Sequence, residues 1–322
     1  MAKRRVLICG ATGFIGRNIA ESFAQDGGLE VVGVFNKRKP FDYPGVAWVQ
    51  ADLTNAQDIE NCIKGVDVIV QAAATTSGSK DIVSRPYIHV TDNAVMNSLL
   101  FRAAHDHGVK HVIFFSCSVM YPSSDTPLRE EDFDASAGIH DRYFGVGWTK
   151  VYIEKMCQFY ARLGKTRYTA IRHSNVYGPY DKYDLERSHV FGATITKVMS
   201  AKDGRIQVWG DGAEARDLIH VDDLTRFVRL AIERQTEPFT LCNVGAGQAV
   251  SIKDLVQRIV KLSGRALAIE HDLTKPTIKT TLSLDCAKAR QDFQWEPKIA
   301  LDDGIATTLD WWRKHIGAAS HG

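Results

Sequence analysis

The chain has 322 residues, of which 44% are hydrophobic and 24% charged, and its formal net charge is +2. This length suits one large α/β domain, or such a domain with a smaller partner. The composition is typical of a folded globular protein, and so small a net charge excludes a broad electrostatic surface for nucleic acid. Any anionic ligand must therefore be held by local groups.

The sequence predicts a protein of the reducing cytoplasm, with no membrane segment and no metal site. The apolar run that follows the basic start ends at Gly10, short of the ~7–15 residues in the core of a secretion signal. No later run approaches the length of a transmembrane helix. The cysteines are widely spaced, at Cys9, Cys62, Cys117, Cys157, Cys242 and Cys286. This spacing argues against both a disulfide framework and a zinc site.

Between residue 5 and about residue 180, short β-branched runs alternate with longer amphipathic runs. Strands are predicted at Arg5–Cys9, Leu29–Phe35, Ala47–Gln50, Val66–Gln71, His111–Ser116 and Tyr168–Arg172. Helices are predicted at Ile15–Ala24, Ala56–Lys64, Val90–His107 and Thr149–Leu163. Such alternation is typical of a doubly wound parallel α/β sheet, the Rossmann architecture, with right-handed crossovers.

After residue 180 the pattern loosens, and helices are predicted at Val190–Met199, Val221–Arg234 and Ile252–Ser263. We expect residues 1–180 to form a dinucleotide-binding domain. Residues 181–322 are expected to form mainly a smaller C-terminal α/β lobe that binds the substrate, with room for the chain to cross back to the sheet. Ligands of open α/β sheets bind beyond the carboxyl ends of the strands, so the cleft is expected there.

A glycine-rich turn, G-x-x-G-x-x-G, links the first predicted strand to the first predicted helix. Glycines permit the tight turn and let backbone amides approach a pyrophosphate, which then lies at the helix N-terminus. A plain helix cap is the structural alternative, but the strand before and the helix after favour dinucleotide binding. The predicted contacts are Gly10, Thr12, Gly13, Phe14, Ile15 and Gly16.

The end of the second strand bears on the choice of cofactor. NAD-preferring sites usually place an acidic residue there to accept the ribose 2′-hydroxyl, but this chain has Asn36, Lys37 and Arg38. Lys37 and Arg38 suit a 2′-phosphate, so the sequence favours NADP over NAD. A solvated basic turn is the alternative interpretation.

Two further strand ends are predicted to border the cofactor. Asp52, followed by Leu53 after the third strand, is placed to accept a hydrogen bond from the adenine amino group. After the fourth strand, the small side chains of Ala72, Ala73 and Ala74 let the backbone pass close to the dinucleotide. Simple packing is the competing interpretation for both segments.

These features and several later motifs resemble the extended short-chain dehydrogenase/reductase family, in its nucleotide-sugar epimerase/dehydratase branch. The likeness covers nearly the whole chain. Its motifs are Ser116–Pro122, the "GWTKVYIEKMC" around Lys150, "RHSNVYGP" at 172–179, "RDLIHVDD" at 216–223, Asn243-Val244-Gly245 and "WEP" at 295–297. The "NVYGPYDKYDLERSHV" segment resembles the GDP-fucose synthase subgroup, which reduces and epimerises a GDP-4-keto-6-deoxyhexose.

The resemblance implies hydride chemistry that uses a Ser or Thr, a Tyr and a Lys. The lysine corresponds to Lys150, but Val146 occupies the tyrosine position and Cys117 the hydroxyl position. Tyr143 is spaced to share a helix face with Lys150 if the helix extends that far, so it could replace the tyrosine, assisted by Ser118 or Cys117. Alternatively, the enzyme relies on a substrate hydroxyl with Lys150 or water, or the fold binds dinucleotide without turnover. Simple packing is the structural alternative for Tyr143.

The GDP-fucose synthase likeness also implies an acid/base pair of Cys and His that epimerises carbons beside the ketone. His189 matches the histidine, whereas Val119 stands at the cysteine position, so double epimerisation is not expected. His189 then serves as a lone base or hydrogen-bond donor, or is structural. The Asp-Glu pair of the dehydratases corresponds to Ser118 and Val119, so elimination of water lacks its acid and base.

The resemblance also implies a set of substrate contacts. Arg216 matches a diphosphate-binding arginine, whose fork geometry suits a bidentate phosphate contact. Surface exposure is the alternative for the charged residues of this set, and core packing the alternative for Trp209. The remaining predicted contacts are Asn175, Arg187, His189, Val190, Trp209 and Lys279 for the substrate, and Lys150, His173 and Val176 for the cofactor.

The sequence thus predicts a nucleotide-sugar oxidoreductase that transfers hydride at C4 of a GDP-linked sugar with NAD(P). An epimerase or 4,6-dehydratase with transient C4 oxidation is the alternative enzyme, and a non-catalytic dinucleotide-binding protein is the alternative of another class. The resemblance implies a homodimer that pairs through the helices at 90–107 and 149–163. Those apolar faces could equally pack only inward.

Overall fold

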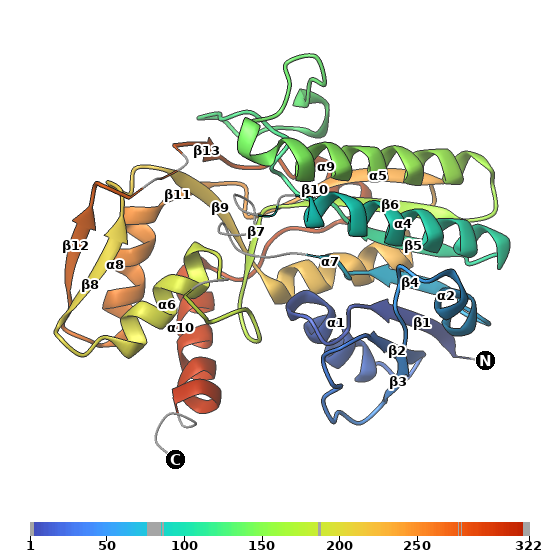
Figure 1. The fold of residues 1–322 in the computed structure, drawn as a ribbon, viewed down its shortest axis with the longest axis horizontal. Helices are drawn as coiled ribbons and strands as arrows, with labels where there is room; N and C mark the ends of the chain where they lie inside the picture. The colour runs from blue at the N-terminus through green and yellow to red at the C-terminus, as the bar shows by residue number, and fades with distance from the viewer. Residues whose placement is uncertain are drawn as a thin grey trace.

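The computed structural model describes residues 3–75, 85, 87–185, 188–275, 277 and 279–317. Within them, seven parallel strands form a central sheet in the order β10-β6-β5-β4-β1-β2-β3 (Figure 1). These strands are β1 (Arg4–Cys9), β2 (Leu29–Phe35), β3 (Val46–Gln50), β4 (Val68–Gln71), β5 (His111–Phe115), β6 (Arg167–His173) and β10 (Phe239–Val244). The predicted doubly wound α/β sheet is confirmed. Its strand order reverses between β1 and β4, which is where such sheets bind dinucleotides.

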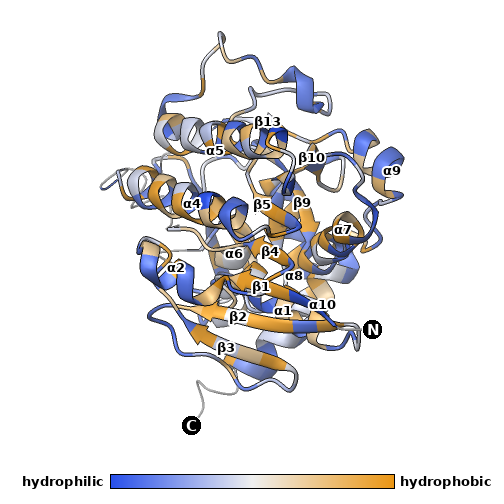
Figure 2. Ribbon diagram, turned by 90° about the vertical axis from the view of Figure 1, so that its right-hand side faces the viewer, coloured by the Kyte–Doolittle hydropathy of each residue, from blue (hydrophilic) through white to orange (hydrophobic). Residues whose placement is uncertain are grey.

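Helices cover both faces of the sheet (Figure 2). One layer holds α2 (Ala56–Cys62), α4 (Ile88–Asp106) and α5 (Phe144–Arg162), and the other holds α1 (Phe14–Ala24), α7 (Val221–Arg234) and α9 (Ala287–Phe293). Successive side chains of a strand point to opposite faces, so in β1 the side chains of Val6 and Ile8 enter one core, and those of Leu7 and Cys9 enter the other. Because both faces are covered, β1, β4 and β5 at the centre of the sheet are largely apolar.

A smaller lobe lies beside the sheet, at the left of Figure 1. It contains α6 (Val190–Ser200), β8 (Arg205–Trp209), α8 (Ile252–Ser263), β12 (Ala268–Asp272) and α10 (Leu301–Trp312), followed by a π-helical turn at Arg313–Gly317. Its core includes Phe191, Ile195, Leu255 and Ile305. A small mixed sheet adjoins this lobe, formed by β7 (Asn175–Tyr177), β9 (Ala215–His220), β11 (Ala249–Ser251) and β13 (Thr281–Leu282).

After β7 the chain returns to the large sheet through α7, β10 and α9. The sequence analysis did not predict β10, because the buried polar residues Thr240 and Asn243 interrupt its apolar pattern. The burial of Asn243 is compensated by hydrogen bonds: its side chain accepts one from the Tyr121 hydroxyl at 2.8 Å and donates one to the Leu128 carbonyl at 2.9 Å. Buried polar groups are tolerated when they are paired in this way.

The start of α5 differs from the prediction, because the helix begins at Phe144 rather than at Thr149. Gly145 and Gly147 weaken the helical pattern of the sequence. Both allow close packing, since a Cβ at either position would lie 2.9 Å from a side-chain carbon, of Val90 and Ile139 respectively. Among the described residues, no helix is long and apolar enough to cross a membrane.

Candidate active site

The glycine turn lies at the point where the strand order reverses. Gly10 follows β1 with a φ of 72°, in the left-handed region that favours glycine. A Cβ there would lie 2.7 Å from the Ala73 Cα, so the chain after β4 runs directly against the turn. A Cβ at Gly16 would collide with the Gly10 carbonyl oxygen. Ala72 and Ala73 thus lie against the turn, and their predicted contact with the dinucleotide stays a prediction.

Helix α1 starts immediately after the turn, at Phe14. Among the described residues, no side chain caps its Gly13 N-cap, and its first turn contains no acidic residue. Its first amides and the positive end of its dipole are thus available to an anion. A glycine cradle that would not admit a side chain, joined to this helix end, fits the pyrophosphate of a dinucleotide.

The residues predicted for the adenosine end lie together. The Arg38 guanidinium donates to the Thr12 carbonyl oxygen at 2.9 Å, which folds it over the glycine turn. Hydrogen bonds from Thr54 hold the pKa of Asp52 below its usual value, and bonding to Asn36 and the charge of Lys37 act in the same direction. Asp52 is therefore a carboxylate at neutral pH, the form that accepts hydrogen bonds. Leu53, the next residue, is buried beneath this group.

Lys150 and Cys117 meet at the carboxyl end of β5. The Lys150 ammonium donates to the Phe115 carbonyl oxygen at 2.7 Å. Burial lowers the pKa of Lys150, and the field of Cys117 partly opposes this. Burial raises the pKa of the Cys117 thiol, with Lys150 acting in the opposite direction. Cys117 is thus a protonated thiol at neutral pH, suited to donate a hydrogen bond rather than to act as a base.

Tyr143 does not share the helix face predicted for it and Lys150. It lies in a 3₁₀ turn, Asp141–Tyr143, and forms the N-cap of α5. Burial raises the pKa of its phenol, the positive charge of Arg216 opposes this, and Cys117 raises it further. Tyr143 is therefore close enough to feel both Cys117, beside the large sheet, and Arg216, on β9. Val146 lies in the first turn of α5 and is half-buried.

Two histidines extend this group towards the smaller lobe. Burial lowers the pKa of His173, at the end of β6, to about 4, and the charges of Lys150 and His189 act in the same direction. His189 is the N-cap residue of α6, and its side chain is exposed. Desolvation by the neighbouring protein groups nevertheless lowers its pKa. Ser118, after β5, is buried. Val176 follows Asn175 on β7 and packs against the core of the large sheet.

The predicted substrate residues come from the smaller lobe and the mixed sheet. The guanidinium of Arg216 donates to the Ala215 carbonyl oxygen at 2.9 Å and to the Thr280 carbonyl oxygen. Asn175 donates to the Asp217 carbonyl oxygen at 3.2 Å. Val190, the first residue of α6, is half-buried.

Two predicted substrate residues lie at the outer side of this lobe, and Arg187 lies outside the described residues. Trp209 is 48% exposed, so the alternative that it belongs to the core is wrong. Its ring lies 5.7 Å from the Lys197 ammonium and 5.9 Å from that of Lys275. Lys279 is exposed and pairs with Asp211 at 3.4 Å.

A buried ion pair that the sequence analysis missed lies behind Lys150. Glu154, one helical turn after Lys150, pairs with Arg172 at 2.8 Å and accepts a hydrogen bond from the Ser116 hydroxyl at 2.6 Å. Arg172 also donates to the Tyr121 hydroxyl at 3.0 Å. The ion pair joins α5 to β6 directly beneath the predicted catalytic residues. Its sequence signals are the K-x-x-x-E spacing in α5 and the arginine that opens "RHSNVYGP".

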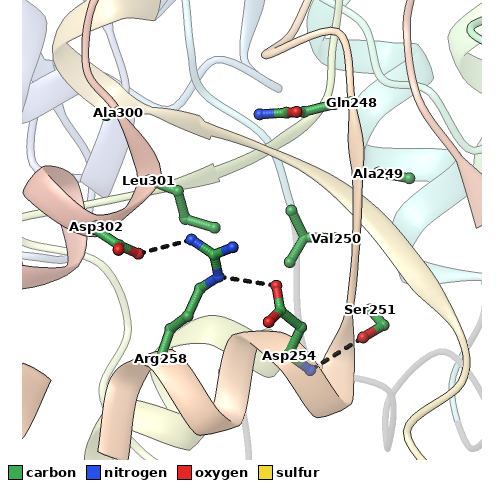
Figure 3. Close-up of a pocket in the computed structure, with 9 residues that line it drawn as sticks. All are labelled: Gln248, Ala249, Val250, Ser251, Asp254, Arg258, Ala300, Leu301 and Asp302. Carbon is green, nitrogen blue, oxygen red and sulfur yellow. Dashed lines mark hydrogen bonds and ion pairs between the residues drawn. The ribbon is translucent and has the colours of Figure 1, made fainter. Parts of the chain in front are cut away.

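A concavity of about 460 Å³ lies elsewhere, between β11, α8 and α10. Arg258 crosses it and pairs with Asp254 at 2.8 Å and with Asp302 at 2.9 Å, while Gln248 lies on the opposite side (Figure 3). None of its lining residues, all of them described, is a predicted site residue. The described residues also hold no cluster of His, Cys, Asp and Glu suited to a metal ion. The candidate chemistry therefore stays at the carboxyl edge of the large sheet.

A glycine turn at the sheet's switch point, with a lysine bonded at the carboxyl end of β5, is typical of a Rossmann-fold enzyme of the dehydrogenase type. Residues 6–245 match the NAD dependent epimerase/dehydratase family. The chain therefore belongs to this family, within the extended short-chain dehydrogenases/reductases, and is an NAD(P)-dependent enzyme.

Relatives of the chain include characterised sugar-nucleotide enzymes. It is 27% identical to the dTDP-4-dehydro-6-deoxy-D-allose reductase of Streptomyces bikiniensis over 98% of each chain. It is 26% identical to the GDP-L-fucose synthase of Escherichia coli over 97% of each chain. The UDP-glucose 4-epimerase of Thermotoga maritima shares the fold, with a TM-score of 0.85, 23% identity, and coverage of 96% of this chain and 99% of that one.

Proposed function

We propose that this enzyme transfers hydride from NADPH to C4 of a GDP-linked sugar. One residue carries the proposal: Tyr143 is a partly buried phenol whose raised pKa is influenced by Arg216, the predicted diphosphate residue, and by Cys117, the predicted hydroxyl-position residue. A proton donor is what ketone reduction requires. The names of the relatives support the reaction, since one reduces a 4-dehydro sugar and another is a GDP-sugar synthase.

The raised pKa of Tyr143 is compatible with a proton donor for reduction. A phenol whose pKa lies above its usual value stays protonated at neutral pH. It can then donate its proton to the C4 oxygen while the bound nicotinamide supplies hydride to the carbon. Lys150, held by the Phe115 carbonyl, would bond the nicotinamide ribose, and the protonated Cys117 thiol would donate a hydrogen bond to the sugar.

The substrate side requires a group for each part of a nucleotide sugar. Arg216 would bind the diphosphate as a bidentate donor, and the exposed ring of Trp209 would border the base. Asn175 and His189 would donate hydrogen bonds to the sugar. Ser118 and Val119 replace the acid and base of the dehydratases, which disfavours elimination.

The choice of NADP rests on Lys37 and Arg38. Both side chains are exposed at the end of β2, and Arg38 is held against Thr12 of the glycine turn. A 2′-phosphate on the adenosine ribose would extend towards these two cations, and Arg suits phosphate geometry.

The test is the change of nicotinamide absorbance when purified protein and NADPH meet GDP-, dTDP-, UDP- or CDP-linked 4-keto sugars. Tyr143→Phe should lower kcat by about 10²–10⁴-fold, the usual contribution of a general acid, with the KM for the sugar little changed. Tyr152→Phe is the matched control, because Tyr152 is exposed on α5, the helix that Tyr143 caps, and phenylalanine keeps its ring for the proposed dimer surface. This variant should keep wild-type activity.

Two outcomes would contradict the proposal. If no hydride is transferred to any of these sugars in a single turnover, the protein binds the cofactor but does not catalyse this reaction. Unchanged kcat in Tyr143→Phe would instead assign the proton to a substrate hydroxyl, Lys150 or water.

We also propose that the protein is a cytoplasmic homodimer paired through α4 and α5. These helices pack side by side (Figure 1) and carry exposed hydrophobic side chains, namely Val95, Phe144, Tyr152, Phe159 and Leu163. Phe159→Glu should yield a monomer in light scattering, whereas Leu273→Glu, which changes an exposed leucine far along the chain, should not. A monomeric wild-type protein would refute the dimer. The six unpaired cysteines support the reducing compartment.

A further inference from the structure

Tyr180 has an unusual backbone conformation close to the candidate site. It follows Gly178 and Pro179 after β7 and has a φ of 69°. This left-handed conformation is unfavourable for residues with a Cβ and persists only where the surroundings impose it. Glycine at this position would relieve the strain but would provide no aromatic ring. The contacts of the Tyr180 ring therefore explain why a tyrosine adopts this conformation.

The ring of Tyr180 is held by side chains from both parts of the molecule. The guanidinium carbon of Arg17, on α1, lies 3.8 Å from the centroid of the Tyr180 ring and 4.0 Å from that of Phe41. Cation–π contacts are favourable at such distances. On the other side, Trp311 of α10 meets Tyr180 edge to face, with 5.1 Å between ring centroids.

The backbone around Tyr180 is fixed by further hydrogen bonds. The Asn18 side chain donates to the Pro179 carbonyl oxygen at 3.0 Å and to the Phe14 carbonyl oxygen at 2.9 Å. The Tyr183 hydroxyl donates to the Gly178 carbonyl oxygen at 2.7 Å. Helix α1 therefore holds this segment at two adjacent residues, by a backbone contact to Pro179 and a ring contact to Tyr180.

Helix α1 and the segment that contains Tyr180 are predicted to bind the two ligands of the proposed reaction, the cofactor and the sugar respectively. Helix α1 begins at the glycine turn, and Phe41 lies in the β2–β3 loop that carries Lys37 and Arg38. The segment that contains Tyr180 starts at β7 with Asn175 and leads towards His189. A shift of about 1 Å between reacting groups can cost 10²-fold in rate.

We propose that Tyr180, clamped by Arg17, is a positioning residue that fixes the substrate-binding segment relative to the cofactor helix. It acts through the residues on either side of it in the segment and touches neither reacting atom. The inference rests on the proposed function for its substrate and extends it by naming how the two sites are held in register.

Replacement of the ring tests this role. Tyr180→Gly suits the observed φ but removes the ring, and it should lower kcat/KM for the sugar by about tenfold or more, while the affinity for NADPH alone stays within about twofold. Tyr180→Phe keeps the ring, loses only the hydroxyl bonds to Glu21 and Trp311, and should retain most of the wild-type kcat/KM. Arg17→Met should also lower kcat/KM. The double variant Arg17→Met/Tyr180→Gly should lose less than the two single losses combined, because both remove the Arg17–Tyr180 contact, although each also removes a contact of its own, to Phe41 or to Trp311.

Gln294→Gly is the matched control. Gln294 is the other described non-glycine residue with positive φ, at 51°, and it caps α9 away from the site. It should show the effect of relieved strain on thermal stability without a loss of activity. The inference is overturned if Tyr180→Gly retains wild-type kcat/KM, if Tyr180→Phe loses as much as Tyr180→Gly, or if the two single losses add in the double variant.

Binding measurements separate this inference from the proposed reaction. Calorimetry on the NADPH-loaded protein would use whichever of GDP, UDP, dTDP and CDP binds the wild type most tightly. Tyr180→Gly should weaken that binding by about tenfold, whether or not the wild type reduces any sugar. Equal affinities would overturn the positioning role even if the enzyme is active, whereas an inactive wild type with weakened nucleotide binding in Tyr180→Gly would overturn only the reaction.

Discussion

The glycine turn offers the sharpest test of the cofactor site, through Gly10→Ala. Gly10 combines a φ of 72° with a very close neighbour, since a Cβ would lie 2.7 Å from the Ala73 Cα and 2.8 Å from the Ala73 nitrogen. Both neighbours are backbone atoms, so the strain cannot be relieved by a side-chain rotation. The chain after β4 or the turn itself must move.

The size of the effect follows from two contributions. A left-handed alanine costs roughly 1–2 kcal/mol, and overpacking against an immobile neighbour costs about 1–3 kcal/mol. Gly10→Ala should therefore destabilise the fold by roughly 2–5 kcal/mol. Gly108→Ala isolates the first contribution, because Gly108 has a φ of 67° and a Cβ there would meet no described atom within 4 Å.

Urea unfolding of both variants and calorimetry with NADPH give the comparison. Gly10→Ala should be less stable than Gly108→Ala by about 1–3 kcal/mol, and only Gly10→Ala should lose cofactor affinity, because only its turn faces the pyrophosphate. Equal destabilisation of the two variants would refute the close approach of the chain after β4 to Gly10. A destabilised Gly10→Ala that still bound NADPH as tightly as the wild type would refute the assignment of the turn.

Three further predictions concern stability and cofactor choice. Burial lowers the pKa of His111 from 6.5 to about 3, so the unfolded chain binds a proton at a higher pH than the folded chain does. The free energy of unfolding should therefore be unaffected above pH 6.5 and should fall by about 2 kcal/mol at pH 5. This loss should be absent in His111→Gln. Glu154→Ala leaves Arg172 buried and unpaired and should cost about 3–5 kcal/mol in urea unfolding, and the double variant Glu154→Ala/Arg172→Met should recover part of it. Arg38→Ala should weaken NADPH binding by about tenfold, the loss of one charged hydrogen bond, and leave NADH binding unchanged; equal losses for both cofactors would contradict the NADP preference.

Most of the large sheet could be predicted from the sequence, because its central strands are buried on both faces. Runs such as residues 6–9 are apolar throughout, and helices of matching length separate them, so a local pattern suffices. The helices at Val221–Arg234 and Ile252–Ser263 were predicted with the bounds that the structure has. The mixed sheet was not predicted, since β7 and β11 have three residues each and β13 has two, too few to show a period.

The grouping of site residues depended on contacts that a local pattern does not contain. Gly10 and Lys150 could be identified from motifs, because their chemistry is encoded within a few neighbouring residues. The electrostatic influence of Arg216 on Tyr143 depends on the fold, because the two residues are far apart in the chain. For the same reason the contact between Arg17 and Tyr180 could not be predicted, because the two residues are far apart in the chain and no local pattern pairs them.

The link between Tyr143 and Arg216 has a consequence for catalysis. The positive charge of Arg216 opposes the raised pKa of the phenol, and a bound diphosphate would neutralise that charge. Substrate binding should therefore raise the pKa of Tyr143 further. The phenol should stay protonated until hydride transfer creates a basic oxygen at C4. The kcat for reduction should then stay level as the pH rises from neutrality towards the usual phenol pKa of about 10, as measured by a pH–rate profile under saturating substrate. A decline centred near neutral pH would identify another group as the acid.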